Sequence, residues 1–222
     1  MGGAVSKQYL QLAGRPVLAH TLAVFEHHPQ IEQICLIVPP ADRDFCRREI
    51  VERFQFHKVA QIVAGGDRRQ DSVAAGLRAL EQGGPVAPDS PILIHDGARP
   101  LFDSSLLSRL IRMIAAHGAC AVGVPVKDTI KDVQDSRITG SPERGRLWQA
   151  QTPQGFHYAL LRQAFDRAER DGFYGTDDAS LLERLGLPVQ MIEGDYRNIK
   201  VTTQEDLLIA SALLGNKKGN SL

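Results

Sequence analysis

Short apolar runs alternate with helical patterns along most of the chain, and this alternation limits the possible folds more than any other feature. Four short runs are typical of strands, namely 34–38, 61–66, 92–95 and 119–124, and the continuous apolar run 34–38 suits a strand buried on both faces. Helices are expected between and around them, over 16–28, 42–54, 71–80 and 104–117. Strands that alternate with helices form parallel sheets with crossover connections. We therefore predict an α/β fold with a Rossmann-like, doubly wound, mainly parallel sheet.

Residues 126–150 interrupt this alternation. Their sequence, VKDTIKDVQD followed by RITG and RGRLWQA, combines short charged, β-branched stretches with turn residues and has no helical period. We predict a hairpin-like β-arm that protrudes from a single domain spanning residues 1–222. Because Leu147 and Trp148 in this arm need cover, we expect a partner subunit there, in a symmetric homodimer.

The charge balance argues against several classes of partner. The 26 Lys and Arg residues equal the 26 Asp and Glu residues, so no long-range field favours nucleic acid or an anionic membrane. No apolar run approaches the ~20 residues that span a bilayer. The three cysteines have unrelated spacings and are typical of reduced thiols in a cytoplasmic protein. No His or Cys spacing typical of a metal site occurs, so we expect no metal site built from protein ligands.

Two charged segments follow predicted strands, where ligands of doubly wound sheets bind. In HDGARP, Asp96 can accept hydrogen bonds from hydroxyls and Arg99 can clamp an anion, although an ion pair between them that closes a turn is the simpler alternative. In GGDRRQDS, glycines let a flat base approach the backbone, and Asp67 or Ser72 can bond the base edge. A tight turn in which Asp71 or Ser72 caps the next helix explains the same residues.

Three further positions carry charge at predicted element ends. Lys7 precedes a helix and can reach a phosphate, although a solvated surface lysine is the common case. Lys200 lies between two apolar neighbours, so in a strand its side chain points the other way, toward a cleft or water. Asp177 and Asp178 precede a predicted helix, and capping of its positive end accounts for both.

Eight segments, in this order and spacing, together resemble one family: KQYL, LAGRPVLAHTL, GGDRRQDSV, HDGARP, PVKDTIK, LWQAQTPQGF, TDDASLLE and NIKVTTQEDL. They are similar to the 2-C-methyl-D-erythritol 4-phosphate cytidylyltransferases. That family joins CTP and methylerythritol phosphate in non-mevalonate isoprenoid biosynthesis and releases pyrophosphate. The resemblance spans about residues 7–213 and is specific because all eight segments are in register.

The resemblance implies roles for the matching positions. Lys7 matches the lysine that stabilises the charged transition state, and Arg144 and Lys200 match the pair that positions the acceptor phosphate. The implied substrate-binding positions are Gly66, Asp67 and Ser72 for cytosine, Asp96 and Arg99 for ribose and substrate, and also Thr129 and Thr152. The family exchanges its arm across a homodimer, so Arg144 and Thr152 are expected to serve the neighbouring subunit's site.

The chemistry of this reaction agrees with such a site. A phosphate monoester has its second pKa near ~6 and is largely a dianion at neutral pH, so it needs no general base. The reaction instead needs charge neutralisation, which fixed cations supply together with Mg²⁺ held mainly through the CTP phosphates.

The first residues depart from the family's pattern. The family begins with a strand and a glycine-rich turn before P-K-Q-Y-L, whereas this chain begins MGGAVSKQYL. We expect the absence of that central strand to leave strand edges unpaired over an apolar gap, and to remove backbone N–H groups that cradle the triphosphate. A longer biological protein, which we favour, and a truncated chain of low stability and weak activity both explain the departure.

Two rival functions stay open at this point. A cytidylyltransferase for another polyol phosphate, such as ribitol 5-phosphate, would share the nucleotide half and differ around Thr129, Arg144 and Thr152. A non-catalytic nucleotide-binding protein would release no pyrophosphate with any acceptor. A dinucleotide dehydrogenase is disfavoured because no G-x-G-x-x-G opens a βαβ unit.

Overall fold

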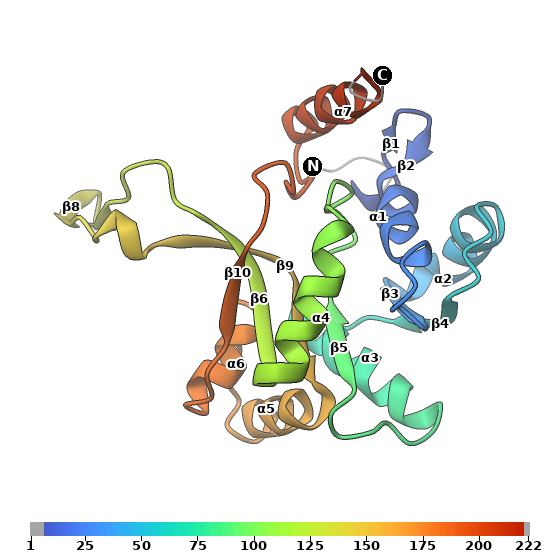
Figure 1. Ribbon diagram of the computed structural model, residues 1–222, viewed down its shortest axis with the longest axis horizontal. Coiled ribbons are helices and arrows are strands. Elements are labelled where there is room, and N and C mark those ends of the chain that lie inside the picture. The colour runs from blue at the N-terminus through green and yellow to red at the C-terminus, as the bar shows by residue number, and fades with distance from the viewer. Residues whose placement is uncertain (1–6, 220–222) are drawn as a thin grey trace.

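The structure is a computed structural model that describes residues 7–219 (Figure 1). Its largest sheet has the strand order β10–β6–β9–β5, formed by Gln190–Glu193, Ala119–Pro125, Trp148–His157 and Pro91–Ile94. Strands β6 and β10 are parallel, whereas β9 is antiparallel to both β6 and β5. A second sheet pairs β3 (Ile34–Val38) with β4 (Val59–Ala64) in parallel. Strands β1 (Gln11–Leu12) and β2 (Arg15–Pro16) form a small antiparallel ladder.

Helices cover these sheets in the order expected from the sequence. They are α1 (Val17–Glu26), α2 (Arg43–Phe45), α3 (Arg69–Gln82), α4 (Ser105–His117), α5 (Tyr158–Arg170), α6 (Ala179–Arg184) and α7 (Gln204–Gly219). Shorter helical segments are η1 (Lys7–Tyr9), η2 (Pro40–Asp42), η4 (Arg144–Arg146) and the π-helical η3 (Cys46–Glu52), which continues α2. Within the described part of the chain, no helix is long and apolar enough to cross a bilayer.

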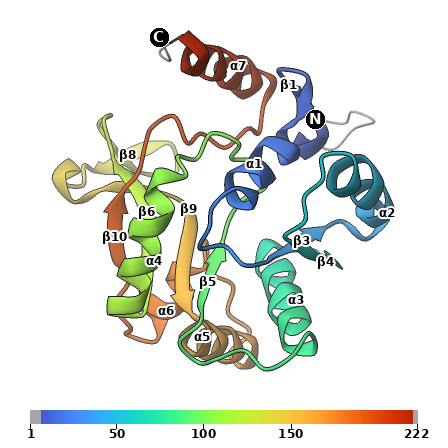
Figure 2. The ribbon, with the colours of Figure 1, turned by 45° about the vertical axis from the view of Figure 1, so that its right-hand side comes forward.

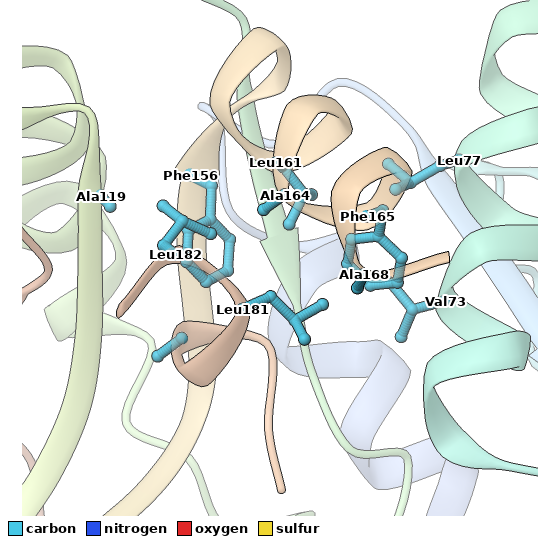
Figure 3. Close-up of a cluster of buried hydrophobic side chains, with 11 residues drawn as sticks. Val73, Leu77, Ala119, Phe156, Leu161, Ala164, Phe165, Ala168, Leu181 and Leu182 are labelled. Carbon is cyan, nitrogen blue, oxygen red and sulfur yellow. The ribbon is translucent and has the colours of Figure 1, made fainter. Parts of the chain in front are cut away.

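One apolar cluster lies where α5 and α6 pack against the large sheet and α3 (Figure 3). Phe156 of β9 and Leu182 of α6 are fully buried in it. The neighbouring Gly155 is required by close packing, because a Cβ there would collide with the side chain of Ile114. This packing fixes β9 firmly against α4 and sets the position of the loops that follow the strands.

The predicted arm is present between β6 and β9 and protrudes from the domain (Figure 1). Its strands β7 (Asp132–Gln134) and β8 (Arg137–Gly140) form an antiparallel hairpin. Asp135 and Ser136 at the turn have φ of 48° and 62°, as a type I′ turn requires. Val133 and Ile138 oppose each other on the hairpin and are 59% and 66% exposed.

The expected sheet is divided in two. Within residues 7–219, β3 pairs only with β4, and β5 pairs only with β9, so the predicted unpaired edges are present. A cavity of about 870 Å³ lies between them. The sheet is also less parallel than predicted at β9. The physical reason is the arm, because a chain that leaves one strand and returns beside it through a hairpin-like excursion makes antiparallel neighbours.

Candidate active site

Three cationic side chains surround the Asp96 carboxylate just after β5. Lys200 Nζ lies 3.1 Å from Asp96 Oδ2, Arg99 Nε lies 3.3 Å from the same oxygen, and Arg69 Nε lies 3.6 Å from Oδ1. Burial alone would raise the pKa of Asp96. The three cations Lys200, Arg69 and Arg99 lower it by more, so the pKa of Asp96 is below its ordinary value. The carboxylate is therefore ionised at neutral pH and holds the three cations together.

Arg69 also forms a buried ion pair with Asp178. Its Nη2 lies 2.6 Å from Asp178 Oδ2, and the Asp178 side chain is only 1% exposed. Burial raises the pKa of Asp178 above its ordinary value, although the Arg69 guanidinium opposes the shift. We call Arg69, Asp96, Arg99, Asp178 and Lys200 the Asp96 cluster. Its three cations outnumber its two carboxylates, so it has a net positive charge suited to an anion.

The loop before α7 holds Lys200 in the cluster through backbone contacts. The Val201 N–H donates to the Ala98 carbonyl at 2.8 Å, and Arg99 Nη1 donates to the Asn198 carbonyl at 2.7 Å. The strand geometry considered for Lys200 is not present, because residues 194–203 form no strand. The two neighbouring side chains still point in opposite directions, because Val201 is buried while Lys200 is exposed and faces the Asp96 cluster.

Thr152 of β9 holds the backbone of Asp96 in place through its hydroxyl group. Its hydroxyl accepts a hydrogen bond from the Asp96 N–H at 3.0 Å and lies 3.1 Å from His95 Nδ1. Burial lowers the pKa of His95 to about 4, so this ring is neutral at neutral pH. The expectation that Thr152 serves a neighbouring subunit is wrong, since it is buried and bonded within its own chain.

The acids before α6 differ from each other. Asp177 Oδ1 accepts from the Ser180 N–H at 2.9 Å, which confirms the capping interpretation for this residue. The interpretation is wrong for Asp178, whose side chain makes no capping bond and instead pairs with Arg69. Gln154 Oε1 accepts from the Asp178 and Ala179 N–H groups at 3.1 Å each, and so orients this turn.

The GGDRRQDS segment forms the tight turn between β4 and α3. Ser72 Oγ accepts from the Gly66 N–H at 3.2 Å, and Asp71 accepts from the Arg68 N–H at 3.1 Å. Gly66 is required here because a Cβ would lie 2.5 Å from the Asp71 Cβ. Asp67 is exposed. The simpler alternative from the sequence is therefore present, and cytosine binding by Gly66, Asp67 and Ser72 stays a prediction.

The remaining predicted positions lie outside the contacts of the Asp96 cluster. Lys7 is exposed in η1, and its neighbour Gln8 lines the same cavity as Asp96 and Lys200. Thr129 and Arg144 are exposed on the arm, where Arg144 Nη1 donates to the Lys127 carbonyl at 3.0 Å. The structure thus brings together Asp96, Arg99, Thr152 and Lys200. It adds Arg69 and His95, which the sequence did not single out, and Asp178, which the sequence assigned to a helix cap.

The cluster fits an anion better than a metal ion bound by protein alone. No group of three or more His, Cys, Asp or Glu side chains able to hold a metal is found among residues 7–219. The carboxylates of Asp96 and Asp178 both face arginine, and Asp96 faces Lys200 as well. Phosphate oxygens are the partners that such closely spaced arginine and lysine groups bind best.

Known proteins resemble the chain over most of its length. The family model described as 2-C-methyl-D-erythritol 4-phosphate cytidylyltransferase matches residues 1–216. A protein of that name from Geotalea uraniireducens is 50% identical over 214 residues, which cover 96% of this chain and 91% of the relative. Another, from Syntrophotalea carbinolica, is 52% identical over 214 residues, which cover 96% of this chain and 90% of the relative.

Solved structures give the same relationship. The 4-diphosphocytidyl-2C-methyl-D-erythritol synthase of Anaerococcus prevotii matches with a TM-score of 0.83 at 30% identity, covering 96% of this chain and 92% of that one. The 2-C-methyl-D-erythritol 4-phosphate cytidylyltransferase of Thermus thermophilus matches with a TM-score of 0.77 at 33% identity, covering 94% of both chains. These likenesses confirm the predicted α/β fold.

Proposed function

The chain belongs to the 2-C-methyl-D-erythritol 4-phosphate cytidylyltransferase family, and we propose that the Asp96 cluster is its catalytic site. The protein is a cytidylyltransferase: it joins CTP and 2-C-methyl-D-erythritol 4-phosphate to give 4-diphosphocytidyl-2-C-methyl-D-erythritol and pyrophosphate. No observation favours ribitol 5-phosphate or a non-catalytic role. The observation that carries the proposed site is the convergence of Arg69, Arg99 and Lys200 at the ends of β4 and β5.

The reaction balances without a protein nucleophile. A phosphate oxygen of methylerythritol phosphate attacks the α-phosphorus of CTP, the bond from that phosphorus to the bridging oxygen of the β-phosphate breaks, and pyrophosphate leaves. The acceptor is already a dianion at neutral pH, so no residue has to remove a proton from it. The barrier lies in bringing anions together, and fixed cations lower it when they are preorganised around the developing charge.

The cluster's cations have different freedom to act in this step. Arg69 and Arg99 are held by second partners, the Asp178 carboxylate and the Asn198 carbonyl. Lys200 reaches Asp96 from the solvent side and its side chain is 44% exposed. We assign Lys200 to the direct contact with the reacting phosphates. Arg69 and Arg99 hold Asp96 in place and supply a fixed positive potential, and Thr152 fixes the backbone of Asp96.

The cofactor and the partner residues of the site are further proposals. Mg²⁺ would bind the CTP phosphates and offset their charge, because the carboxylates of the Asp96 cluster already face cations. Lys7 would add a cation beside Gln8 at the cavity.

The exposure of Val133 and Ile138 supports a homodimer through the arm, in which Thr129 and Arg144 would reach the neighbour's site. Cytosine binding by Gly66, Asp67 and Ser72 and a cytoplasmic location complete the proposal.

A pyrophosphate-release assay tests the proposed site. CTP and Mg²⁺ are supplied with methylerythritol phosphate or with ribitol 5-phosphate, and Lys200→Ala is compared with Lys58→Ala, whose ammonium bonds the His28 carbonyl. We expect turnover with methylerythritol phosphate, a loss of about 10²–10³ in rate for Lys200→Ala, and no change for Lys58→Ala. Equal rates for both variants would remove Lys200 from the site, and faster turnover of ribitol 5-phosphate would change the acceptor.

A further inference from the structure

The loop between β10 and α7 passes the root of the arm before it reaches the Asp96 cluster (Figure 2). We call residues 194–203 the Lys200 loop and residues 125–127 the arm root. The Tyr196 hydroxyl donates to the Pro125 carbonyl at 2.6 Å, and the Lys127 ammonium lies 3.4 Å from the centre of the Tyr196 ring. The Tyr196 side chain therefore fastens the Lys200 loop to the arm root.

The two contacts use two different features of tyrosine. Its phenol hydroxyl can donate to a carbonyl, and the face of its aromatic ring attracts a cation. The Tyr196 side chain is not part of the apolar core, because the residue is 39% exposed. Its contribution is therefore a pair of specific contacts to the arm root rather than the filling of space in the interior.

A tight turn carries the position of Tyr196 toward the Asp96 cluster. The Asn198 N–H donates to the Asp195 carbonyl at 3.0 Å, which makes Tyr196 the second residue of this turn. Asn198 is only 1% exposed, and its Nδ2 donates to the Thr152 carbonyl at 2.9 Å and to Gln151 Oε1 at 3.0 Å. The turn is thus held at one corner by the arm root and at its end by β9.

The arm root also contacts a residue of the arm that the family resemblance assigns to the reaction. Lys127 places its ammonium over the Tyr196 ring, and its carbonyl accepts from Arg144 Nη1 at 3.0 Å. The adjacent Val126 N–H donates to the Leu147 carbonyl at 2.9 Å and so joins the two sides of the arm. A movement of the arm root would therefore reach both Arg144 and the Lys200 loop.

We propose that Tyr196 is a positioning residue for Lys200. It ties the Lys200 loop to the arm root, so the place of the Lys200 ammonium beside Asp96 depends on where the arm root lies. This inference rests on the proposed contact of Lys200 with the reacting phosphates. Tyr196 acts through Lys200 and is assigned no contact with the reactants. Since a misplacement of about 1 Å can cost about 10² in rate, partial freedom of the loop should be readily measurable.

Pyrophosphate release from CTP, Mg²⁺ and methylerythritol phosphate tests the role of Tyr196. We expect the rate to fall about tenfold in Tyr196→Ala and about threefold in Tyr196→Phe, which keeps the ring under the Lys127 ammonium. In a Lys200→Ala background, either substitution should change the residual rate by less than about twofold, because no ammonium is left to position. The matched control is Tyr158→Phe, which removes a 2.6 Å bond to Glu81 and should keep the wild-type rate.

The four backgrounds separate this inference from the proposed function. If Tyr196→Ala slows the reaction equally with and without Lys200, Tyr196 acts on another group and the inference is wrong. A wild-type rate for Tyr196→Ala overturns it as well. If Lys200→Ala alone keeps the wild-type rate, the proposed function of Lys200 is wrong, and Tyr196 has no catalytic cation to position.

Hydrogen exchange follows the Lys200 loop without any substrate. The Val201 N–H donates to the Ala98 carbonyl at 2.8 Å, so its exchange reports how often the loop leaves the Asp96 cluster. Tyr196→Ala should speed exchange of this amide at least about fivefold, whereas Tyr158→Phe should leave it unchanged. Unchanged exchange at Val201 in Tyr196→Ala would show that the loop is held without Tyr196, and would overturn the inference whatever the kinetics.

Discussion

Arg69→Ala tests how far the Asp96 cluster supports the fold. The substitution leaves the Asp178 carboxylate, whose side chain is 1% exposed, without its cation at 2.6 Å. Removing one partner of a buried ion pair costs about 3–5 kcal/mol. The Arg69 side chain is 35% exposed, so water reaches this pair and we expect the lower end of that range, about 3 kcal/mol. In a chain of this size such a loss lowers the Tm by about 6–12 °C.

The loss should depend on pH in a defined direction. Burial raises the pKa of Asp178, and without Arg69 nothing of opposite charge in this pair opposes that shift. A carboxyl whose folded-state pKa is raised stabilises the fold below its unfolded-state pKa and loses that contribution as pH rises through the folded-state pKa. The deficit of Arg69→Ala relative to the wild type is therefore large at neutral pH and smaller near pH ~4, where Asp178 is protonated.

Two variants serve as controls for this measurement. Arg68→Ala removes the adjacent guanidinium, which stacks on Tyr174 at 3.8 Å and should cost about 0.5–1 kcal/mol. Asp178→Asn combined with Arg69→Ala removes both charges, so the double variant should be less destabilised than the sum of the single variants. Urea unfolding at both pH values is the assay. A deficit below about 1 kcal/mol at neutral pH, or one that is unchanged in acid, would refute the reasoning.

Three further predictions follow from exposure and packing. Lys200→Ala should change the free energy of unfolding by less than about 1 kcal/mol while the rate falls, because its ion pair is half-exposed; a large loss of stability in urea would contradict this. Ile138→Asp should shift the proposed arm-mediated dimer to monomers in light scattering without lowering protomer stability, and an unchanged mass would exclude the arm tip as an interface. Gly155→Ala should destabilise by about 1–3 kcal/mol through collision with Ile114, whereas Gly145→Ala, with open space around it, should be neutral in the same urea assay.

Local pattern was enough to place the elements and part of the site. The apolar run ICLIV predicted β3 with the bounds that the structure shows, because no polar residue within the run blurs its ends. The expected burial on both faces is incomplete, since Ile34, Cys35 and Ile37 are only partly buried. The rule that ligands bind after the strands directed attention to Asp96 and Arg99. Lys200 was singled out by assuming strand geometry, which this segment does not have. The inference about its side chain still held, because the apolar neighbour Val201 is buried in the loop while Lys200 is exposed.

Contacts between segments far apart in the sequence could not be predicted from local sequence patterns. Arg69 and Asp178 are 109 residues apart, and Asp178 has a satisfactory local explanation as a helix cap. Nothing in TDDASLLE distinguishes the acid that caps α6 from the acid that pairs with Arg69. Thr152 was assigned to a neighbouring subunit because the resemblance implies an exchanged arm, whereas its contact with the Asp96 N–H depends on the register of β9 against β5. That register becomes visible only in three dimensions.

The second partners of each cation divide the work within the Asp96 cluster. Three cations within 4 Å of one carboxylate repel one another, so they stay together only while Asp96 is ionised and held by Thr152. Arg69 and Arg99 have partners besides Asp96, whereas Lys200 forms an ion pair with Asp96 alone among residues 7–219. An arriving phosphate can therefore draw Lys200 away from Asp96 without breaking the framework. Substitution of Lys200 should then slow the reaction and spare the fold, and substitution of Arg69 should damage the fold first.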